Sequence, residues 1–155
     1  MAFTAQDVKA LREKTGVGMM ECKKALVEAD GDMDKAVDFL RERGLAAAAK
    51  KATRIAAEGV VLPYYDAEAK KGVVVEVNSE TDFVAKNEKF MSFVEGVAKT
   101  ILATNPADVE ALKEEKFDGT DRTVTETLND LVLSIGENMK VRRFERMDGI
   151  VSTYI

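Results

Sequence analysis

Hydrophobic residues in the first 44 positions recur at the three- and four-residue intervals of amphipathic helices. Short polar breaks divide this pattern into three parts, so the sequence predicts three short helices. The residues expected to face inward are Val8 and Leu11, then Cys22, Ala25, Leu26 and Ala29, and finally Met33, Ala36, Val37 and Leu40. Residues 1–44 are therefore expected to form a small three-helix module.

Local signals mark the ends of these helices. Thr4 and Asp7 have the spacing of a capping box at the start of the first helix. Asp32 is placed to cap the third helix, and Gly44 suits a left-handed end to it. Residues 45–58 are then alanine-rich with a basic centre. We expect this segment to be a helical linker between the module and the rest of the chain.

The spacing of apolar residues changes from helical to extended after the linker. Residues 59–66 and 71–78 have the pattern of two strands, and Pro63 favours an edge position for the first. Helical segments follow, carrying Phe90, Phe93, Val94, Val97, Ile101 and Leu102, then Asn105-Pro106, and then Thr123, Val124, Glu126, Leu128, Leu131, Val132 and Ile135. These elements predict an α+β fold, in which residues 59–155 form a core subdomain with helices covering one face of an antiparallel sheet.

The end of the chain carries a second extended pattern. Asp148-Gly149 is a strong hairpin signal between residues 140–147 and residues 150–155. Residues 150–155 are β-prone and apolar, so a strand formed there would present an uncovered edge. We therefore expect either that the chain is truncated here or that this strand pairs with another chain, and the second case predicts self-association.

Composition removes several classes of function. The chain has 155 residues, a net charge of -5, one cysteine and no histidine. The acidic balance argues against a nucleic-acid-binding protein, because neutralising phosphates needs a basic face. No metal-ligand spacing, cofactor motif or paired catalytic carboxylates are present, so neither a metal, a cofactor nor an enzyme activity is expected. A single cysteine fits a reducing cytoplasm, and no apolar run approaches the ~18 residues of a membrane span.

Three short motifs have an ordinary structural interpretation that outweighs a functional one. Gly16-Val17-Gly18 lacks the preceding strand of a phosphate-binding loop and is interpreted as a turn. Cys22 has no histidine to activate it as a nucleophile, so burial is favoured. Lys50, Lys51 and Arg54 make a weak basic patch that is more typical of a solvated helix face than of an RNA site.

Two further motifs remain open on residue chemistry alone. Met19-Met20 suits either an adaptable binding patch or simple core packing. Phe83 lies in the polar stretch NSETDFVAKN, seven residues before Phe90, so a continuous helix would bury both rings on one face. Asn87-Glu88, however, has the pattern of a new helix start, which would leave Phe83 free to point elsewhere.

Three separated stretches resemble the elongation factor Ts family. These are LREKTGVGMMECKKALVEADGDMDKAVDFLR (11–41), EVNSETDFVAKNEKF (76–90) and IGENMKVRRFERMDG (135–149), in the same order as in the family. The resemblance extends over essentially the whole sequence, although typical members continue into a second half of the core and often into a C-terminal helical module. It implies a ubiquitin-associated-like three-helix fold for residues 1–44.

The resemblance also implies a function. Family members are guanine nucleotide exchange factors for the translational GTPase elongation factor Tu (EF-Tu), and their TDFV motif reaches the GTPase near its bound magnesium. The resemblance therefore implies that Asp82 and Phe83, which match this motif by position, are the residues inserted into the GTPase. Thr81 and Val84 would shape the end of the segment that carries them. The head module also contacts the GTPase in the family, which makes Leu11, Arg12, Met19 and Met20 weaker candidates.

Two alternatives come from other functional classes. The three-helix head alone would fit a module that binds ubiquitin-like or other proteins without exchange activity, but this leaves residues 55–155 unexplained. An acid-dependent enzyme using Asp82 would need a second catalytic group, and the sequence offers none.

Overall fold

The computed structural model describes residues 3–155, and within that range it contains seven helices and a three-stranded antiparallel sheet. This mixture agrees with the predicted α+β class. The chain forms two compact units. The helical unit comprises the described residues up to Thr53 together with Asn129–Glu137, and the sheet unit comprises Arg54–Leu128 and Asn138–Ile155.

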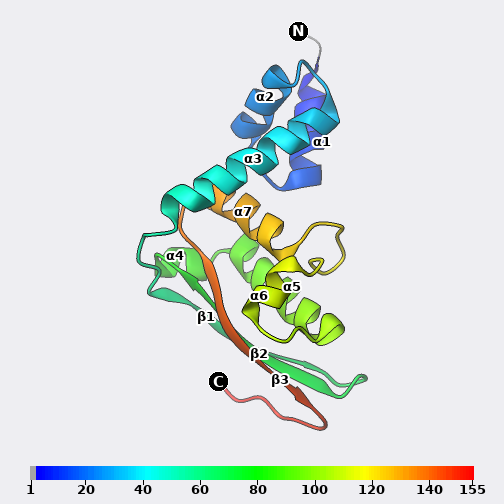
Figure 1. Ribbon diagram of the computed structural model, residues 1–155, viewed down its shortest axis with the longest axis vertical. Helices are drawn as coiled ribbons and strands as arrows, with labels where there is room; N and C mark the ends of the chain where they lie inside the picture. Colours follow the sequence, from blue (N-terminus) through cyan, green and yellow to red (C-terminus); the bar gives the residue numbers. More distant parts are fainter. Residues whose placement is uncertain (1–2) are drawn as a thin grey trace. The chain divides into compact units, whose positions relative to one another are not determined.

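The helical unit is built from α1 (Ala5–Thr15), α2 (Met19–Glu28) and α3 (Met33–Lys51), which are labelled in Figure 1. The capping box predicted at Thr4 is present, because the Thr4 N–H donates to the Asp7 carboxylate at 2.7 Å and the Thr4 hydroxyl oxygen accepts from the Asp7 N–H. Asp32 caps α3 by accepting from two backbone N–H groups. The three predicted helices are therefore confirmed. α1 and α3 begin at their predicted polar caps, and α2 begins directly after the predicted Gly16-Val17-Gly18 turn.

The core of the helical unit contains the inward faces that the periodicity predicted. Its buried residues are Val8, Leu11, Val17, Cys22, Ala25, Leu26, Ala29, Ala36, Val37 and Leu40, with Phe3, Met33, Phe39 and Leu133 packed against them. Leu133 belongs to α7 (Val124–Ile135), whose residues from Asn129 onward are part of this unit. The sequence assigned this segment to the other domain, because its helical pattern gave no sign of which core it joins.

Gly44 does not end the third helix, so that prediction is wrong. α3 runs through Gly44 to Lys51, and the first seven residues of the expected linker belong to it. A Cβ placed on Gly44 would lie 3.2 Å from the backbone oxygen of Asn129. The glycine therefore permits close packing against another helix of the same unit, instead of supplying a left-handed cap.

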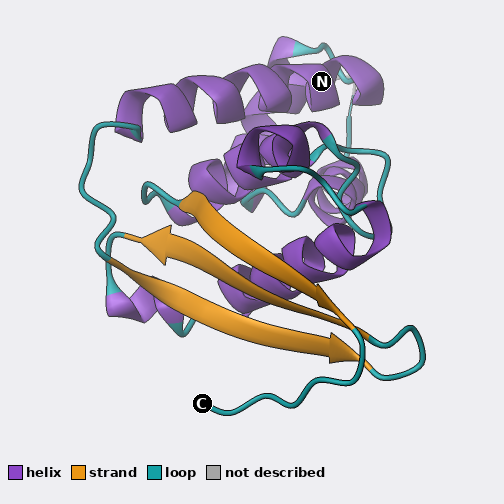
Figure 2. Cartoon of the chain, turned by 60° about the horizontal axis from the view of Figure 1, so that its bottom comes forward, coloured by secondary structure: helices purple, strands orange, loops and turns teal. Residues whose placement is uncertain are grey.

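The sheet unit contains β1 (Glu58–Asp66), β2 (Lys71–Ser79) and β3 (Lys140–Asp148), in the order β1-β2-β3 and antiparallel throughout. Side chains of β2 alternate between the two faces of the sheet. Val73, Val75 and Val77 are buried on one face, and α5 (Glu88–Thr104) packs on β1 and β2. Figure 2 shows the three strands as one twisted layer.

Two further helices, and the first residues of a third, complete this unit. α4 (Asp82–Ala85) follows β2, and α6 (Val109–Glu114) begins at the cap Asp108, a few residues later than the Asn105-Pro106 signal suggested. α7 begins at the capping box of Thr123 and Glu126, as predicted. Phe93 of α5 stacks on Phe117 with ring centroids 5.5 Å apart.

The predicted C-terminal strand is not formed, and neither is the hairpin expected at Asp148-Gly149. β3 ends at Asp148, and Gly149 adopts φ 115° while its N–H donates to the Lys70 carbonyl at 2.7 Å. This bond extends the pairing of β3 with β2 by one residue, and the positive φ of Gly149 then takes the chain out of the sheet. Val151 then lies against the position where Gly72 lacks a side chain, so the segment packs on β2 without pairing with it. Figure 2 shows this last segment returning beside the strands as a loop.

Between residues 3 and 155, no helix combines the length and the apolar character needed to cross a membrane.

Candidate functional site

The NSETDFVAKN stretch forms a short connection between β2 and α5. We call residues 80–87 the tip segment. Thr81 has an extended backbone and caps α4, since its hydroxyl oxygen accepts the Val84 N–H at 3.4 Å. Ser79, which is fully buried, donates its hydroxyl hydrogen to the Thr81 carbonyl at 3.0 Å. The tip segment is therefore attached through its backbone to the end of a buried strand.

The single turn of α4 sends its two apolar side chains in different directions. Val84 is 8% exposed and packs inward, whereas Phe83 is 83% exposed. The helix that would have buried Phe83 does not continue, because Asn87 is extended and starts α5 by accepting from the N–H groups of Lys89 and Phe90. Of the two alternatives for Phe83, the structure therefore favours the free aromatic ring.

Asp82 and Lys86 place a charged pair beside this ring. The Lys86 ammonium donates to the Asp82 carboxylate at 3.1 Å across one helical turn, and both side chains are exposed. The hydrogen bond from Lys86 lowers the pKa of the Asp82 carboxyl below its usual value. Asp82 is thus an ionised group at neutral pH, unlike a general acid, whose pKa has to be raised.

Polar contacts at the base of the tip segment involve residues that sequence analysis missed. Glu80 accepts from the backbone N–H of Asn138 and also pairs with Arg54. Asn138 in turn donates from its side chain to the Arg54 carbonyl. These three residues are 26 to 84 positions apart, and no local spacing rule can connect residues that only the fold brings together.

The predicted head residues divide into two groups. Leu11 is fully buried in the core of the helical unit, so its side chain offers no surface to a partner. Arg12 is exposed, and Met19 and Met20 are 45% and 66% exposed at the start of α2. The open question about the methionine pair is therefore answered in favour of a surface position. These residues lie in the helical unit, whereas Thr81, Asp82, Phe83 and Val84 lie in the sheet unit.

Cys22 is a core residue. It is fully buried, and its thiol donates to the Val17 carbonyl at 3.5 Å. Burial raises the pKa of the thiol, which disfavours the reactive thiolate. The prediction that Cys22 is a buried residue and not a nucleophile agrees with its position in the core.

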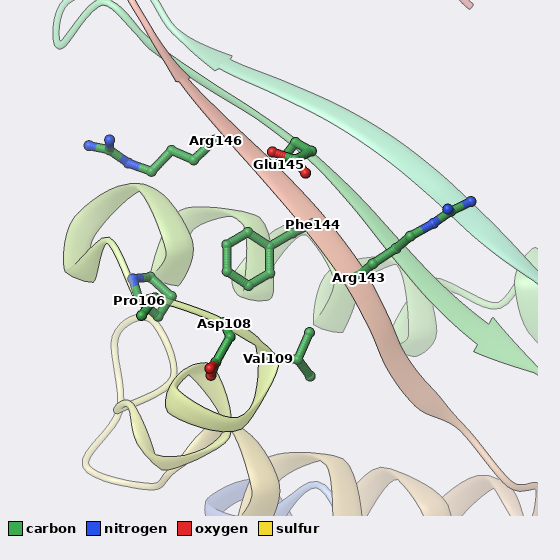
Figure 3. Close-up of a pocket in the computed structure, with 8 residues that line it drawn as sticks. Pro106, Asp108, Val109, Arg143, Phe144, Glu145 and Arg146 are labelled. Atoms are coloured by element: carbon green, nitrogen blue, oxygen red, sulfur yellow. The ribbon is translucent and has the colours of Figure 1, made fainter.

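A pocket of about 380 Å³ lies between the start of α6 and β3. In Figure 3 Phe144 points from β3 toward α6, and Arg143 extends to the other side of the strand. Asp108 and Glu145 are the acidic residues that line this pocket. Asp108 already accepts from the Ala111 N–H at 2.8 Å as a helix cap, and Arg146 pairs with Asp148. The lining residues include no serine, threonine, cysteine or lysine that could act as a nucleophile beside a base.

No cluster of three or more potential metal ligands occurs among the described residues 3–155. Phe83 combines high exposure with a capped helical turn and a charged pair beside it. A rigidly attached aromatic ring that is left in water is typical of a contact with another protein.

Comparison with known proteins gives a consistent result. The family model described as elongation factor TS matches residues 80–155, which include the tip segment. An elongation factor Ts from Clostridium perfringens (strain SM101 / Type A) is 58% identical over 156 residues, covering 99% of this chain and 51% of the relative. The elongation factor Ts of Syntrophotalea carbinolica is 55% identical over 158 residues, covering 100% of this chain and 52% of the relative.

A further relative, elongation factor Ts from Clostridium novyi (strain NT), is 54% identical over 98% of this chain. The chain spans about half the length of the curated relatives that it matches. The alignments cover the helical unit as well as the sheet unit, so the likeness is not confined to one motif. The chain belongs to the elongation factor Ts family.

Proposed function

We propose that this chain is a guanine nucleotide exchange factor that acts on EF-Tu during translation elongation. The observation that carries the proposal is Phe83, an 83% exposed aromatic side chain held on a capped helical turn. Membership of the elongation factor Ts family supports the identity of the partner. On this proposal Phe83 is the group that enters EF-Tu, Asp82 accompanies it, and Thr81 and Val84 hold the turn in shape.

The chemistry of magnesium explains how such a group would release a nucleotide. Mg²⁺ requires nearly ideal octahedral oxygen ligands, and it links the phosphates of the nucleotide to the switch segments of a GTPase. A ring inserted beside those segments displaces them and spoils this geometry. Nucleotide affinity then falls without any covalent bond being made or broken, so the protein acts as an exchange factor and not as an enzyme.

Linkage sets the energy that the contact must supply. If the factor weakens nucleotide binding about 1000-fold, the nucleotide weakens binding of the factor by the same ratio, which corresponds to ~4 kcal/mol. Complete burial of one phenylalanine side chain contributes ~1.5–3 kcal/mol. Phe83 alone is therefore not sufficient, and a second contact region is needed.

The helical unit offers that second region. Met19, Met20 and Arg12 are exposed on it, and methionine side chains adapt readily to a partner surface. Leu11 is assigned a supporting role beneath this surface, because it is buried in the core. We further propose that the three helices α1–α3 form the ubiquitin-associated-like head of the family and that the protein works in the cytoplasm, where EF-Tu and reduced thiols occur together.

The test is release of a fluorescent GDP from EF-Tu in the presence of excess unlabelled GDP, with and without the chain. The chain is expected to accelerate release in proportion to its concentration until EF-Tu is saturated. Added magnesium should oppose the effect, since it restores the ligand geometry that the ring disturbs. The proposal would be wrong if the chain saturates EF-Tu and GDP release still occurs at the unassisted rate. In that case the chain would be a protein-interaction module without exchange activity.

A further inference from the structure

Three polar residues form a closed set of contacts where the tip segment leaves β2. The Glu80 carboxylate accepts the backbone N–H of Asn138 at 2.6 Å, and the Arg54 guanidinium lies 3.5 Å from the same carboxylate oxygen. The side-chain amide of Asn138 donates to the Arg54 carbonyl at 2.8 Å. We call Arg54, Glu80 and Asn138 the Glu80 cluster, in which each residue contacts the other two.

The Glu80 cluster joins three parts of the sheet unit that are distant in sequence. Arg54 is the first residue of the unit, Glu80 directly follows β2, and Asn138 lies two residues before β3. Asn138 is 4% exposed, so its hydrogen bonds are protected from water. Two of the three contacts end on backbone atoms, namely the Asn138 N–H and the Arg54 carbonyl. Glu80 is therefore fixed to the main chain and not only to a mobile side chain.

α4 depends on such external support. It has four residues, and its internal bonds from Ala85 to Thr81 and from Lys86 to Phe83 are both 3.3 Å long. A single turn of helix is unstable in water by itself, because few hydrogen bonds offset the cost of ordering the chain. The packing of Val84 fixes one side of this turn, and its N-terminal end is fixed by the residues that lead into it, of which Glu80 directly precedes the cap Thr81.

We propose that Glu80 is a positioning residue for nucleotide exchange, which holds α4 so that Phe83 presents its ring in one direction, with Arg54 and Asn138 as the partners that fix it. This inference rests on the proposed function of Phe83. Glu80 touches no substrate in this scheme and acts only through the aromatic ring.

Glu80→Ala and Glu80→Gln test the proposal on the whole chain, with Glu76→Ala as the matched control. Glu76 is a partly buried carboxylate in the same unit, and it also pairs with an arginine, at 2.6 Å from Arg143 Nε. Glu80→Ala should lower the maximal rate of GDP release about ten- to a hundredfold, because small misplacements of a reacting group have effects of this size. Glu80→Gln should keep most of the activity, since its side-chain oxygen still accepts the Asn138 N–H. Glu76→Ala should exchange nucleotide at the parental rate.

A double variant separates positioning from general destabilisation. In the Phe83→Ala background, Glu80→Ala should have no further effect on the release rate, because the ring through which Glu80 acts is gone. An equal loss in both backgrounds would overturn the proposal. The same is true if Glu80→Ala exchanges nucleotide at the parental rate while Phe83→Ala is impaired.

Amide hydrogen exchange of the free chain gives a readout that does not involve EF-Tu. Glu80→Ala should accelerate exchange at Val84, Ala85 and Lys86, and Glu76→Ala should not. Unchanged protection of these amides in Glu80→Ala would overturn the positioning role, even if Phe83 proved essential. If Phe83→Ala instead exchanged GDP at the parental rate, the proposed function would fail, while the amide measurement would still decide whether Glu80 orients α4.

Discussion

Phe83 and Phe90 are seven residues apart, yet Phe83 is 83% exposed while Phe90 is completely buried. A continuous helix would have placed both rings on one face. The chain instead leaves the helical conformation at Asn87, whose ψ of 134° is extended and whose side chain caps the next helix. One asparagine thus separates an aromatic residue that builds the core from one that is available to a partner.

The first prediction compares the two rings directly. Phe83→Ala should change the free energy of unfolding by no more than ~0.5 kcal/mol, because it removes few contacts, but it should nearly abolish nucleotide exchange. Phe90→Ala should cost ~3–5 kcal/mol of stability, as a large deletion in a packed core does. The measurements are the urea unfolding midpoint of each variant and the rate of fluorescent GDP release from EF-Tu.

Both halves of this comparison are open to contradiction. A stable Phe83→Ala protein that exchanges nucleotide at the parental rate would eliminate the ring as the active group. A large fall in its unfolding midpoint would show that Phe83 supports the fold despite its exposure.

The second prediction concerns the charge pair beside the ring. The hydrogen bond from Lys86 lowers the pKa of Asp82, so Lys86→Met should raise that pKa toward the ordinary value of ~3.9. Because the folded pKa is the lower one, the pair stabilises α4 above the unfolded pKa and loses this effect as the pH falls through the folded pKa. An NMR titration of the Asp82 carboxyl carbon between about pH 2 and 6 measures the shift. The same titration midpoint in Lys86→Met would show that Lys86 has no part in it.

Much of the fold could be predicted from the sequence because helix caps and hydrophobic periodicity are local signals. Thr4 with Asp7, Asp32, and Thr123 with Glu126 each mark a helix start, and each is confirmed by a hydrogen bond of the expected kind. The alternation in residues 71–78 likewise matches the buried valines of β2. Caps and periodicity are set by residues three or four positions apart, so a single sequence contains them.

The errors arose where a distant segment decides the conformation. A glycine at position 44 is typical of a helix end, but here the backbone of Asn129 packs so closely that a Cβ on residue 44 would crowd it. Residues 150–155 have strand propensity, but the positive φ of Gly149, which follows the last residue of β3, takes them out of the sheet. The exposure of Phe83 was open for the same reason, since contacts of α4 with β1 and β2, strands that begin far from it in sequence, help to fix which of its sides faces water.

The third prediction separates core from surface in the helical unit. Leu11→Ala should cost ~2–5 kcal/mol of unfolding free energy, because Leu11 is fully enclosed. Met20→Ala should leave stability within ~0.5 kcal/mol but weaken binding to EF-Tu. Thermal unfolding followed by circular dichroism and titration calorimetry with EF-Tu give the two quantities. Equal EF-Tu affinity for Met20→Ala and the parent would remove the methionine pair from the contact surface.

The fourth prediction concerns the C-terminal segment. Ile150, Tyr154 and Ile155, which belong to one six-residue segment, are each at least 86% exposed, and exposed apolar side chains promote association. The chain should therefore self-associate in a concentration-dependent way in sedimentation equilibrium, although no strand is formed there. A variant with Ile150→Ser, Tyr154→Ser and Ile155→Ser should sediment as a monomer. A parent that remains monomeric at the highest concentrations would refute this prediction.

The last prediction tests whether the head separates from the rest of the chain. The sequence placed its boundary at residue 44, whereas the compact units divide after Thr53 and the helical unit also includes Asn129–Glu137. Removing residues 1–44 should leave the sheet unit folded, because its core draws on Val73, Val75 and Val77 and on α5. Binding to EF-Tu should weaken, since the exposed methionines are lost.

Leu133 is expected to determine the solubility of the shortened chain. It packs on the head core, so deletion of the head uncovers it, and the remainder should aggregate more readily than the parent. Leu133→Ser in the shortened chain should restore solubility without altering the sheet. A chain that lacks residues 1–53 should likewise aggregate with Leu133 present and be soluble with Leu133→Ser. Urea unfolding by circular dichroism is the measurement, with one cooperative transition and an m-value reduced in line with the smaller buried surface as the expected result. A broad transition in both shortened chains, with Leu133 replaced, would mean that the sheet unit needs the head in order to fold.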